Sequence, residues 1–168
     1  TAKNICKSLN IKYCHIRLSI PYSIRDNQDF YFTNVIKEIS KGQQPMIQSL
    51  YSAKDYIHAS DIARAIIDLV ENQQEGTFNI GSGEAISTKS LLNMIYQKFG
   101  KQLKVNDIME EKKEIDEFSL NIKKMYSKVL WKPSISIWDG LSLLVHENKF
   151  NSKPSMEEFA DRIRNLCK

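Results

Sequence analysis

The residues that could do chemistry in this chain are concentrated in two stretches that lie close together. The first stretch, from Lys54 to Ile66, begins with a Lys-Asp pair, and the second, from Gly76 to Gly83, carries three glycines. Their spacing predicts a short strand, an amphipathic helix capped by Ser60 or Asp61, and a second strand that ends in a glycine turn.

Two catalytic patterns are missing from the sequence. No GxxGxxG stretch is present to cradle the phosphates of a dinucleotide, and no YxxxK pair is present to move a proton. The three histidines and three cysteines show no metal-ligand spacing. We therefore expect this chain alone to hold no catalytic residue, no metal and no NAD.

Composition indicates one globular unit. The chain has 168 residues, of which 42% are hydrophobic and 26% charged, so it can bury one core but not two large domains. No apolar run approaches the roughly 20 residues that cross a bilayer. The odd number of cysteines argues against a disulfide framework and favours a cytoplasmic location. Because Thr1 is neither an initiator Met nor the start of an apolar signal segment, we expect a piece of a longer chain.

The charge pattern is mixed. The net charge of +4 comes from 24 basic and 20 acidic residues, a balance that suits an anionic small molecule. The densest basic run consists of Lys123, Lys124, Lys128 and Lys132. A solvated helical face is favoured over a nucleic-acid surface, because no aromatic stacking platform accompanies these lysines. We expect no nucleic-acid partner and no membrane partner.

Strand and helix patterns alternate along the chain, which predicts an α/β fold. Strands are expected at residues 11–18, 46–48, 56–58 and 77–80, and helices at 5–10, 30–41, 60–70, 87–99 and 121–129. Ser136 and Ser155 have capping-box spacing and each should open a further helix. The strongly charged residues 107–117 predict a mobile loop. If the strand at 11–18 lacks neighbours, its exposed edge invites a homo-oligomer.

Several stretches resemble, in the same order, the C-terminal part of the NAD-dependent epimerases and dehydratases, the extended short-chain dehydrogenase/reductase family. Residues 54–66 and 76–83 resemble its signature RDYIHVxDxAxAI followed by GxxxNIGSG. Residues 15–23 resemble LRLxNVYGP, residues 121–133 resemble DIxKAxxxLGWxP, and residues 138–141 resemble LxEGL. The shared order carries the resemblance, because no single match is specific.

The resemblance covers residues 1–147, and residues 148–168 are expected to form a helical extension. It implies the C-terminal part of a Rossmann-like extended short-chain dehydrogenase/reductase, together with the small substrate-binding domain. The family acts on sugars carried by nucleotide diphosphates, with NAD as the cofactor of the parent protein. The resemblance therefore implies the substrate-binding portion of a UDP-glucose 4-epimerase-like enzyme, with the catalytic Tyr/Lys pair upstream.

Two positions of this sequence correspond to residues with which the family binds the diphosphate. Lys54 stands where the family has an arginine, and because lysine is a compact point charge without the planar fork of arginine, weaker binding is expected. The family's asparagine that also contacts the diphosphate falls at Ile20, which cannot donate a side-chain hydrogen bond.

The resemblance also implies roles for six further residues. Those placed near the nucleotide sugar are Tyr22, Lys112, Lys113 and Phe118, and those placed near the cofactor are Ser19 and Pro21. Tyr22 could equally pack beneath its turn. Leu130 replaces a family glycine, so the exit from the preceding helix is expected to differ.

Two other interpretations stay open. The departures at Ile20, Ser23, Lys54 and Leu130 favour a non-catalytic, degenerate binding or assembly module. A reductase of the same superfamily that acts on a non-nucleotide carbonyl would also explain the altered diphosphate contacts. The sequence immediately upstream of Thr1 distinguishes these readings, because a YxxxK there would support the enzyme.

Overall fold

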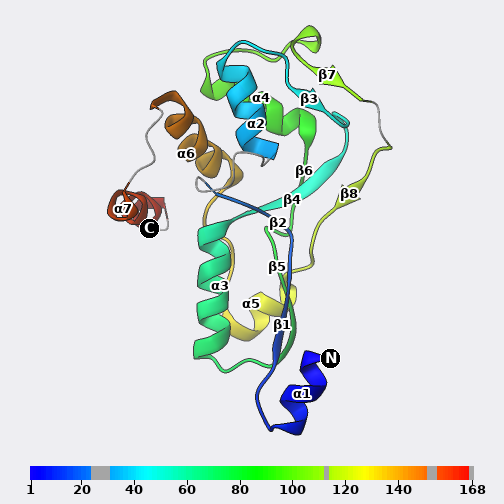
Figure 1. Ribbon diagram of the computed structural model, residues 1–168, viewed down its shortest axis with the longest axis vertical. Helices are drawn as coiled ribbons and strands as arrows, with labels where there is room; N and C mark the ends of the chain where they lie inside the picture. Colours follow the sequence, from blue (N-terminus) through cyan, green and yellow to red (C-terminus); the bar gives the residue numbers. More distant parts are fainter. Residues whose placement is uncertain (24–30, 112–113, 151–154, 167–168) are drawn as a thin grey trace.

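The computed structural model describes residues 1–23, 31–111, 114–150 and 155–166 (Figure 1). Its helices are α1 (Ala2–Ser8), α2 (Tyr31–Ser40), α3 (Ala59–Glu71), α4 (Thr88–Lys98), α5 (Lys123–Val129), α6 (Ile137–Phe150) and α7 (Met156–Leu166). Its strands are β1 (Cys14–Leu18), β2 (Ile20–Tyr22), β3 (Met46–Ile47), β4 (Ala53–His58), β5 (Gly76–Ile80), β6 (Ala85–Ser87), β7 (Met109–Glu110) and β8 (Glu117–Phe118). The mixture confirms the α/β class.

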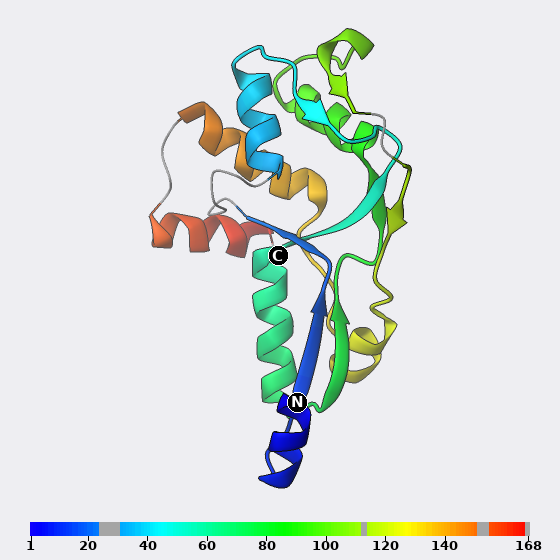
Figure 2. The same cartoon turned by 45° about the vertical axis from the view of Figure 1, so that its right-hand side comes forward.

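β1 and β5 form a parallel pair, from Cys14 opposite Gly76 to Leu18 opposite Ile80. α3 runs alongside this pair (Figures 1 and 2). Residues of β5, α3 and α5, together with one residue of β4 and one that follows α5, form a sheet cluster. Its members are Ile57, Ile62, Ala65, Leu69, Phe78, Ile80, Met125 and Trp131. In the part of the chain that the structure describes, β1 has no strand on its other edge.

β4 crosses the middle of the molecule, between the part that contains α2 and α4 and the part that contains α3 (Figure 1). Its carboxyl half pairs in parallel with β2, and its amino half pairs antiparallel with β6 and parallel with β8. β3 and β7 form a separate parallel pair. Residues 107–117 were expected to form a mobile loop. They contain β7 and the first residue of β8, so the prediction of a loop throughout this segment was wrong. Their partner strands are distant in sequence, so the local charge pattern could not reveal them.

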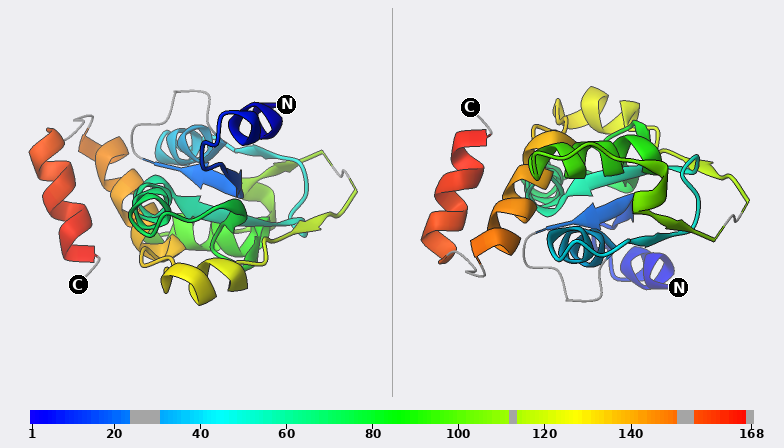
Figure 3. Two further views of the ribbon diagram at one scale, coloured as in Figure 1. Left: turned by 90° about the horizontal axis from the view of Figure 1, so that it is seen from below. Right: turned by 90° about the horizontal axis from the view of Figure 1, so that it is seen from above.

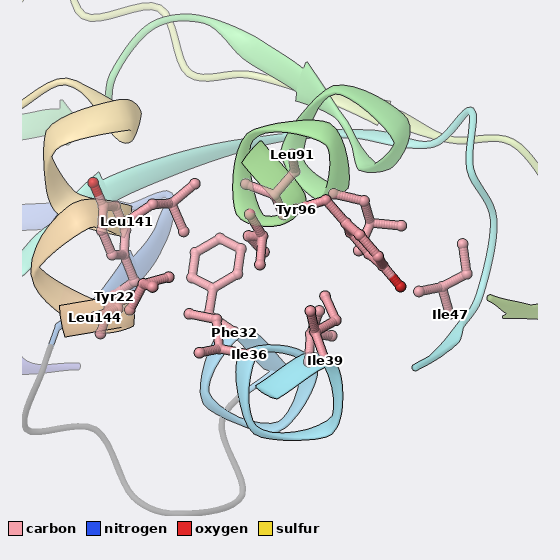
Figure 4. Packing of buried hydrophobic residues seen from close by; sticks show 13 residues of the cluster. Tyr22, Phe32, Ile36, Ile39, Ile47, Leu91, Tyr96, Leu141 and Leu144 are labelled. Atoms are coloured by element: carbon pink, nitrogen blue, oxygen red, sulfur yellow. The ribbon is translucent and has the colours of Figure 1, made fainter. Parts of the chain in front are cut away.

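The helices α2, α4 and α6 enclose a second core, which we call the helical cluster (Figure 4). The apolar stripe of α2 and the inner face of α4 point toward each other, and Phe32 and Tyr22 fill the space beside α6. Its buried members are Tyr22, Phe32, Val35, Ile36, Ile39, Ile47, Leu91, Leu92, Ile95, Tyr96, Leu141, Leu144 and Val145. The helical spacing of these residues in the sequence follows from this packing.

Helix caps test the sequence predictions at single residues. Ser87 caps α4 as predicted, because its Oγ accepts a hydrogen bond from the Ser90 N–H at 3.2 Å. The predicted cap of α3 at Ser60 or Asp61 was wrong. His58 is the cap, and its Nδ1 accepts from the Ser60 N–H at 3.2 Å. Asp61 is used for a different contact, described below.

The exit of α5 also differs from the expectation. Leu130 takes the left-handed conformation, with φ of 53°, and its N–H bonds the Tyr126 carbonyl. This is the backbone that a glycine would adopt, so the helix ends in the ordinary way despite the substitution. The left-handed conformation strains a leucine by about 1–2 kcal/mol.

α6 and α7 both lie at one side of the molecule (Figure 3). Both serines cap their helices as predicted: Ser136 Oγ accepts from the Asp139 N–H, and Ser155 Oγ accepts from the Glu158 N–H. At Ser155 the box is complete, because the Ser155 N–H donates to the Glu158 carboxylate at 2.9 Å. The predicted division at residues 147 and 148 falls inside α6. None of the described helices is long and apolar enough to span a membrane.

Candidate functional site

The carboxyl ends of β1 and β5 meet at Ser19 and Gly81. In open parallel sheets, ligands bind outside these ends. The Ser19 N–H donates to the Ile80 carbonyl at 3.0 Å, and its side chain is 5% exposed. Among the described residues, Ser19 Oγ has no hydrogen-bond partner. A Cβ on Gly81 would stand 3.0 Å from that oxygen and 2.6 Å from Asp55 Oδ2, so only glycine fits beside them.

Asp55 is the residue that connects the segments around the carboxyl ends of β1 and β5. Its carboxylate is fully buried and accepts hydrogen bonds from the Ser82 N–H and Oγ, both at 2.7 Å. It also accepts from the Gly83 N–H at 3.2 Å and from the Leu120 N–H at 3.0 Å. Four donors satisfy one buried charge, as burial of a carboxylate requires. Asp55 thereby ties β4 to the glycine turn after β5 and to the segment before α5.

Asp61 makes a second tether. Its buried carboxylate accepts from the N–H groups of Ser134 and Ile135, at 3.2 and 3.0 Å, and from Ser134 Oγ at 3.0 Å. Arg64 pairs with the same carboxylate at 2.5 Å and also reaches the Lys132 carbonyl. These bonds hold the start of α3 against the loop that leads into α6. Asp61 is therefore neither a helix cap nor open to a ligand.

Lys54 and Phe118 are brought together by the parallel pairing of β4 and β8, in which they stand opposite each other. The two were 64 positions apart in the sequence (118 − 54). The Lys54 ammonium forms an ion pair with Asp116, and this contact lowers the pKa of the Asp116 carboxyl, with further help from Ser52. Phe118 is 39% exposed beside it. The arrangement offers a partly neutralised cation next to an aromatic surface.

The other predicted site residues are placed differently. Tyr22 is 1% exposed in the helical cluster, with its ring 5.4 Å from that of Phe32 and 5.3 Å from that of His58. Pro21 is exposed on β2, one residue from Ile20. Lys112 and Lys113 lie outside the described residues, so they do not enter the geometry. The surface at Lys54 and Phe118 is thus separate from Tyr22.

Burial shifts the pKa values of several groups near β4. It lowers the pKa of His58 to about 4, an effect that the nearby Asp61 carboxylate partly opposes. His58 is therefore neutral at pH 7, with its Nδ1 acting as an acceptor. Burial also raises the pKa of Tyr56 to about 12 and raises that of Tyr22 further. None of these groups is set to exchange a proton near neutral pH.

Metal chemistry receives no support from the described part of the chain. It contains no group of three His, Cys, Asp or Glu side chains that could hold an ion. At the carboxyl ends of the strands, the Asp55 carboxylate is bound to donors of Ser82, Gly83 and Leu120, whereas the buried Ser19 Oγ has no hydrogen-bond partner among the described residues. These groups can shape and position a ligand surface.

The tethers at Asp55 and Asp61 were missed by sequence reasoning. Their signal was available, because each carboxylate lies in or beside an apolar stretch, where an unpaired charge would be costly. The partners of Asp55 include residues 82–83, which belong to a recognised motif, whereas its partner at residue 120 and the partners of Asp61 at residues 134–135 lie directly beside the motif at residues 121–133. The motif residues therefore contact one another, or residues next to another motif, within the fold.

Comparison with known proteins places this arrangement in a family. The family model of GDP-mannose 4,6 dehydratase matches residues 1–143. Over 146 residues the chain is 30% identical to the dTDP-4-dehydro-6-deoxyglucose reductase of Escherichia coli, covering 84% of this chain and 46% of that protein. It is 28% identical over 100 residues to the UDP-glucuronate 4-epimerase of Thermodesulfobacterium geofontis, covering 59% of this chain and 31% of that protein.

Solved structures share the fold. The UDP-glucose 4-epimerase of Thermotoga maritima, solved with UDP-glucose, superposes with a TM-score of 0.78 at 19% identity, covering 89% of this chain and 50% of that one. The dTDP-glucose 4,6-dehydratase of Bacillus anthracis, solved with NAD, gives 0.78 at 18% identity, with 89% and 48% covered.

This chain thus spans about half the length of the relatives it matches. The structures that share its fold include NAD complexes, which supports NAD as the cofactor of the family. The expected family is confirmed by the match over residues 1–143. The chain belongs to the GDP-mannose 4,6 dehydratase family, among the NAD-dependent epimerases and dehydratases of the extended short-chain dehydrogenase/reductase type.

Proposed function

We propose that this chain is the substrate-binding portion of an NAD-dependent nucleotide-sugar epimerase or dehydratase, and that a preceding segment supplies the catalytic half. The parallel pair of β1 and β5 carries the proposal. Parallel strands are normally buried inside larger sheets with helices on both faces. Here β1 is paired on one edge only within the described residues, so the pair fits as the last part of a longer sheet.

The surface at Lys54 and Phe118 is the proposed contact for the nucleotide diphosphate. A lysine ammonium suits a phosphate oxygen, and an exposed aromatic ring suits a nucleobase. Both residues lie on the β4–β8 pair, near the carboxyl ends at Ser19 and Gly81 that Asp55 draws together. The sugar and cofactor would then meet beyond these ends, next to Ser19 and Pro21.

Titration of the chain with UDP and dTDP at low ionic strength tests this surface. Lys54→Ala should weaken binding tenfold or more, because a charge-assisted hydrogen bond contributes about 1.5–3 kcal/mol. Lys54→Arg should hold or improve it. Asp116→Asn should strengthen it, since the competing carboxylate of the Lys54 ion pair is removed. Lys89→Ala, at an exposed lysine on α4, is the matched control.

The open edge of β1 supports a second part of the proposal, self-association of the isolated chain. Unpaired backbone groups on an edge strand pair readily with another chain. Leu18, a half-exposed residue at the end of β1, is a suitable place for a charge. Sedimentation should show association that depends on concentration, and Leu18→Lys should shift the chain toward monomer. A clean monomer at all concentrations would contradict association through this edge.

A non-catalytic binding or assembly module is the second candidate. The ion pair between Lys54 and Asp116 favours it, because the cation expected to bind a diphosphate already has a carboxylate partner. Under this alternative, the Lys54 and Asp116 variants and the Lys89 control would bind UDP equally. That result would put the module ahead of the substrate-binding proposal.

A further inference from the structure

A pocket of about 610 Å³ lies between α1 and the amino-terminal ends of β1 and β5. This is the opposite end of the parallel pair from Ser19 and Gly81, as the strand directions in Figure 1 show. Its walls come from Lys3 and Lys7 of α1, from residues 10–13 of the following connection, and from residues 75–77. The volume falls within the range of about 300–1,000 Å³ typical of small-molecule sites.

The lining of this pocket is cationic. It contains Lys3, Lys7 and Lys12 against a single carboxylate, that of Glu75. Lys3 and Lys7 are one helical turn apart on α1, where like charges repel each other. The ion pairs found in the described residues involve neither of them. A bound anion would relieve this repulsion, which the chain itself leaves uncompensated.

A further ammonium, from α5, lies near two of the lining residues. Lys124 Nζ donates to the Thr77 carbonyl at 2.7 Å and would stand 3.5 Å from a Cβ on Gly76. Lys12 Nζ is oriented by a bond of 2.8 Å to Gln73 Oε1. Lys3 and Lys7 therefore line the pocket from α1 and Lys12 lines it from the connection that follows, while Lys12 and the neighbouring Lys124 are held in place by hydrogen bonds. A solvated helical face would not produce this convergence.

The remaining wall is suited to a flat ring. Ile11 and Tyr13 line the same pocket between the lysines and the start of β5. Gly76 also lines it and has no side chain to fill the space. We propose that this pocket binds a nucleotide bearing a di- or triphosphate, with the phosphates held by Lys3, Lys7 and Lys12 and the base against Tyr13. The site is independent of the proposed function, whose contacts lie at Lys54 and Phe118.

Calorimetric titration of the chain with ADP and with inorganic pyrophosphate tests the proposal. The double variant Lys3→Gln/Lys7→Gln should weaken binding of both probes at least tenfold. Lys37→Gln/Lys41→Gln changes the net charge equally at two exposed lysines at the end of α2, and it should leave binding unchanged. α1 contains no buried residue, so the double variant should keep its melting temperature.

Two outcomes would overturn the site. Equal weakening by the two double variants would mean attraction by net charge alone, and absence of binding by the unmodified chain would mean that the pocket holds no such ligand. The base contact has its own test, because Tyr13→Ala should reduce ADP affinity to that of pyrophosphate. Equal affinities of the unmodified chain for ADP and pyrophosphate would overturn the nucleotide assignment. Lys54→Ala should leave this site unchanged, which separates it from the proposed substrate surface.

Discussion

The helical cluster and the parallel pair differ in how completely they are covered. In the helical cluster, α2, α4 and α6 bury Tyr22, Phe32 and their neighbours almost entirely (Figure 4). Around the parallel pair, α3 covers one face only. Ile66, Ile67 and Val70 on α3 are exposed, and so is Leu18 on β1. The first region is a complete core, whereas the second has the surface of a layer that lacks its neighbour.

Residues of the family motifs make the contacts that connect these two regions. Asp55 binds the glycine turn, Asp61 binds the loop before α6, and Gly140 lies against the Tyr22 hydroxyl. The contacts of Asp55 and Gly140 link stretches that were recognised separately in the sequence, and the contact of Asp61 links one such stretch to residues beside another. The signature therefore identifies the fold of this chain, and it says less about the ligand than its family resemblance suggests.

The largest expected effect is the loss of folding stability when the Asp55 carboxylate, which connects the two regions, is removed. Asp55→Ala removes the acceptor of the Ser82, Gly83 and Leu120 N–H groups, and bonds to charged groups contribute about 1.5–3 kcal/mol each, so we expect a loss of at least about 3 kcal/mol. Denaturant unfolding followed by far-UV circular dichroism should show a lower midpoint. Glu71→Gln, at an exposed carboxylate of α3, should not change it. An unchanged Asp55→Ala midpoint would mean that the regions hold together without this tether.

Acid should lower the folding stability through His58, which caps α3 and contacts Tyr22. The folded pKa of about 4 lies below the ordinary 6.5, so the unfolded chain takes up a proton first. The stabilisation is complete above pH 6.5 and is lost as the pH falls toward 4, by about 3 kcal/mol in total.

Unfolding measured between pH 7 and pH 4 checks this effect. His58→Asn keeps an acceptor for the Ser60 N–H but does not titrate, so its stability should fall less over the same interval. Both proteins share every other titrating group, and the difference isolates His58. Parallel pH profiles would show that His58 is protonated in the folded chain as readily as in the unfolded one.

Gly140→Ala tests how tightly the helical cluster is closed. A Cβ at this position would overlap the Tyr22 hydroxyl and ring, and overpacking of a core costs about 1–3 kcal/mol. Thermal unfolding should show the loss. Tyr22→Phe should restore part of it in the double variant, because it removes the overlapping oxygen. If the two substitutions were additive, Tyr22 would not be the group that Gly140 accommodates.

The smallest effect is expected at the end of α5, beside the parallel pair. Leu130 is 77% exposed and held at a positive φ, so Leu130→Gly should stabilise the chain by about 1 kcal/mol or less. Leu130→Ala removes most of the side chain but keeps the strain, and it should bring no gain. Chemical denaturation compares the three proteins. Equal stability of the glycine and alanine variants would show that the backbone there is not strained.

The sequence by itself determined the kinds of elements and their order. Helical spacing located α2 and α4, Ser87 marked a cap, and the motifs identified the family, because all these signals depend on residues near one another in the chain. Even the positive φ at Gly42 follows from local chemistry.

Only the tertiary structure decided what the polar residues do. Asp61 could cap a helix or bind Ser134, and Lys54 could bind a ligand or pair with Asp116, which lies 62 positions away. β7 and β8 form within a charged segment for the same reason, since β3 and β4 supply their partners. A buried carboxylate or a short strand is stabilised by whichever donors the fold brings to it, and those donors are distant in sequence.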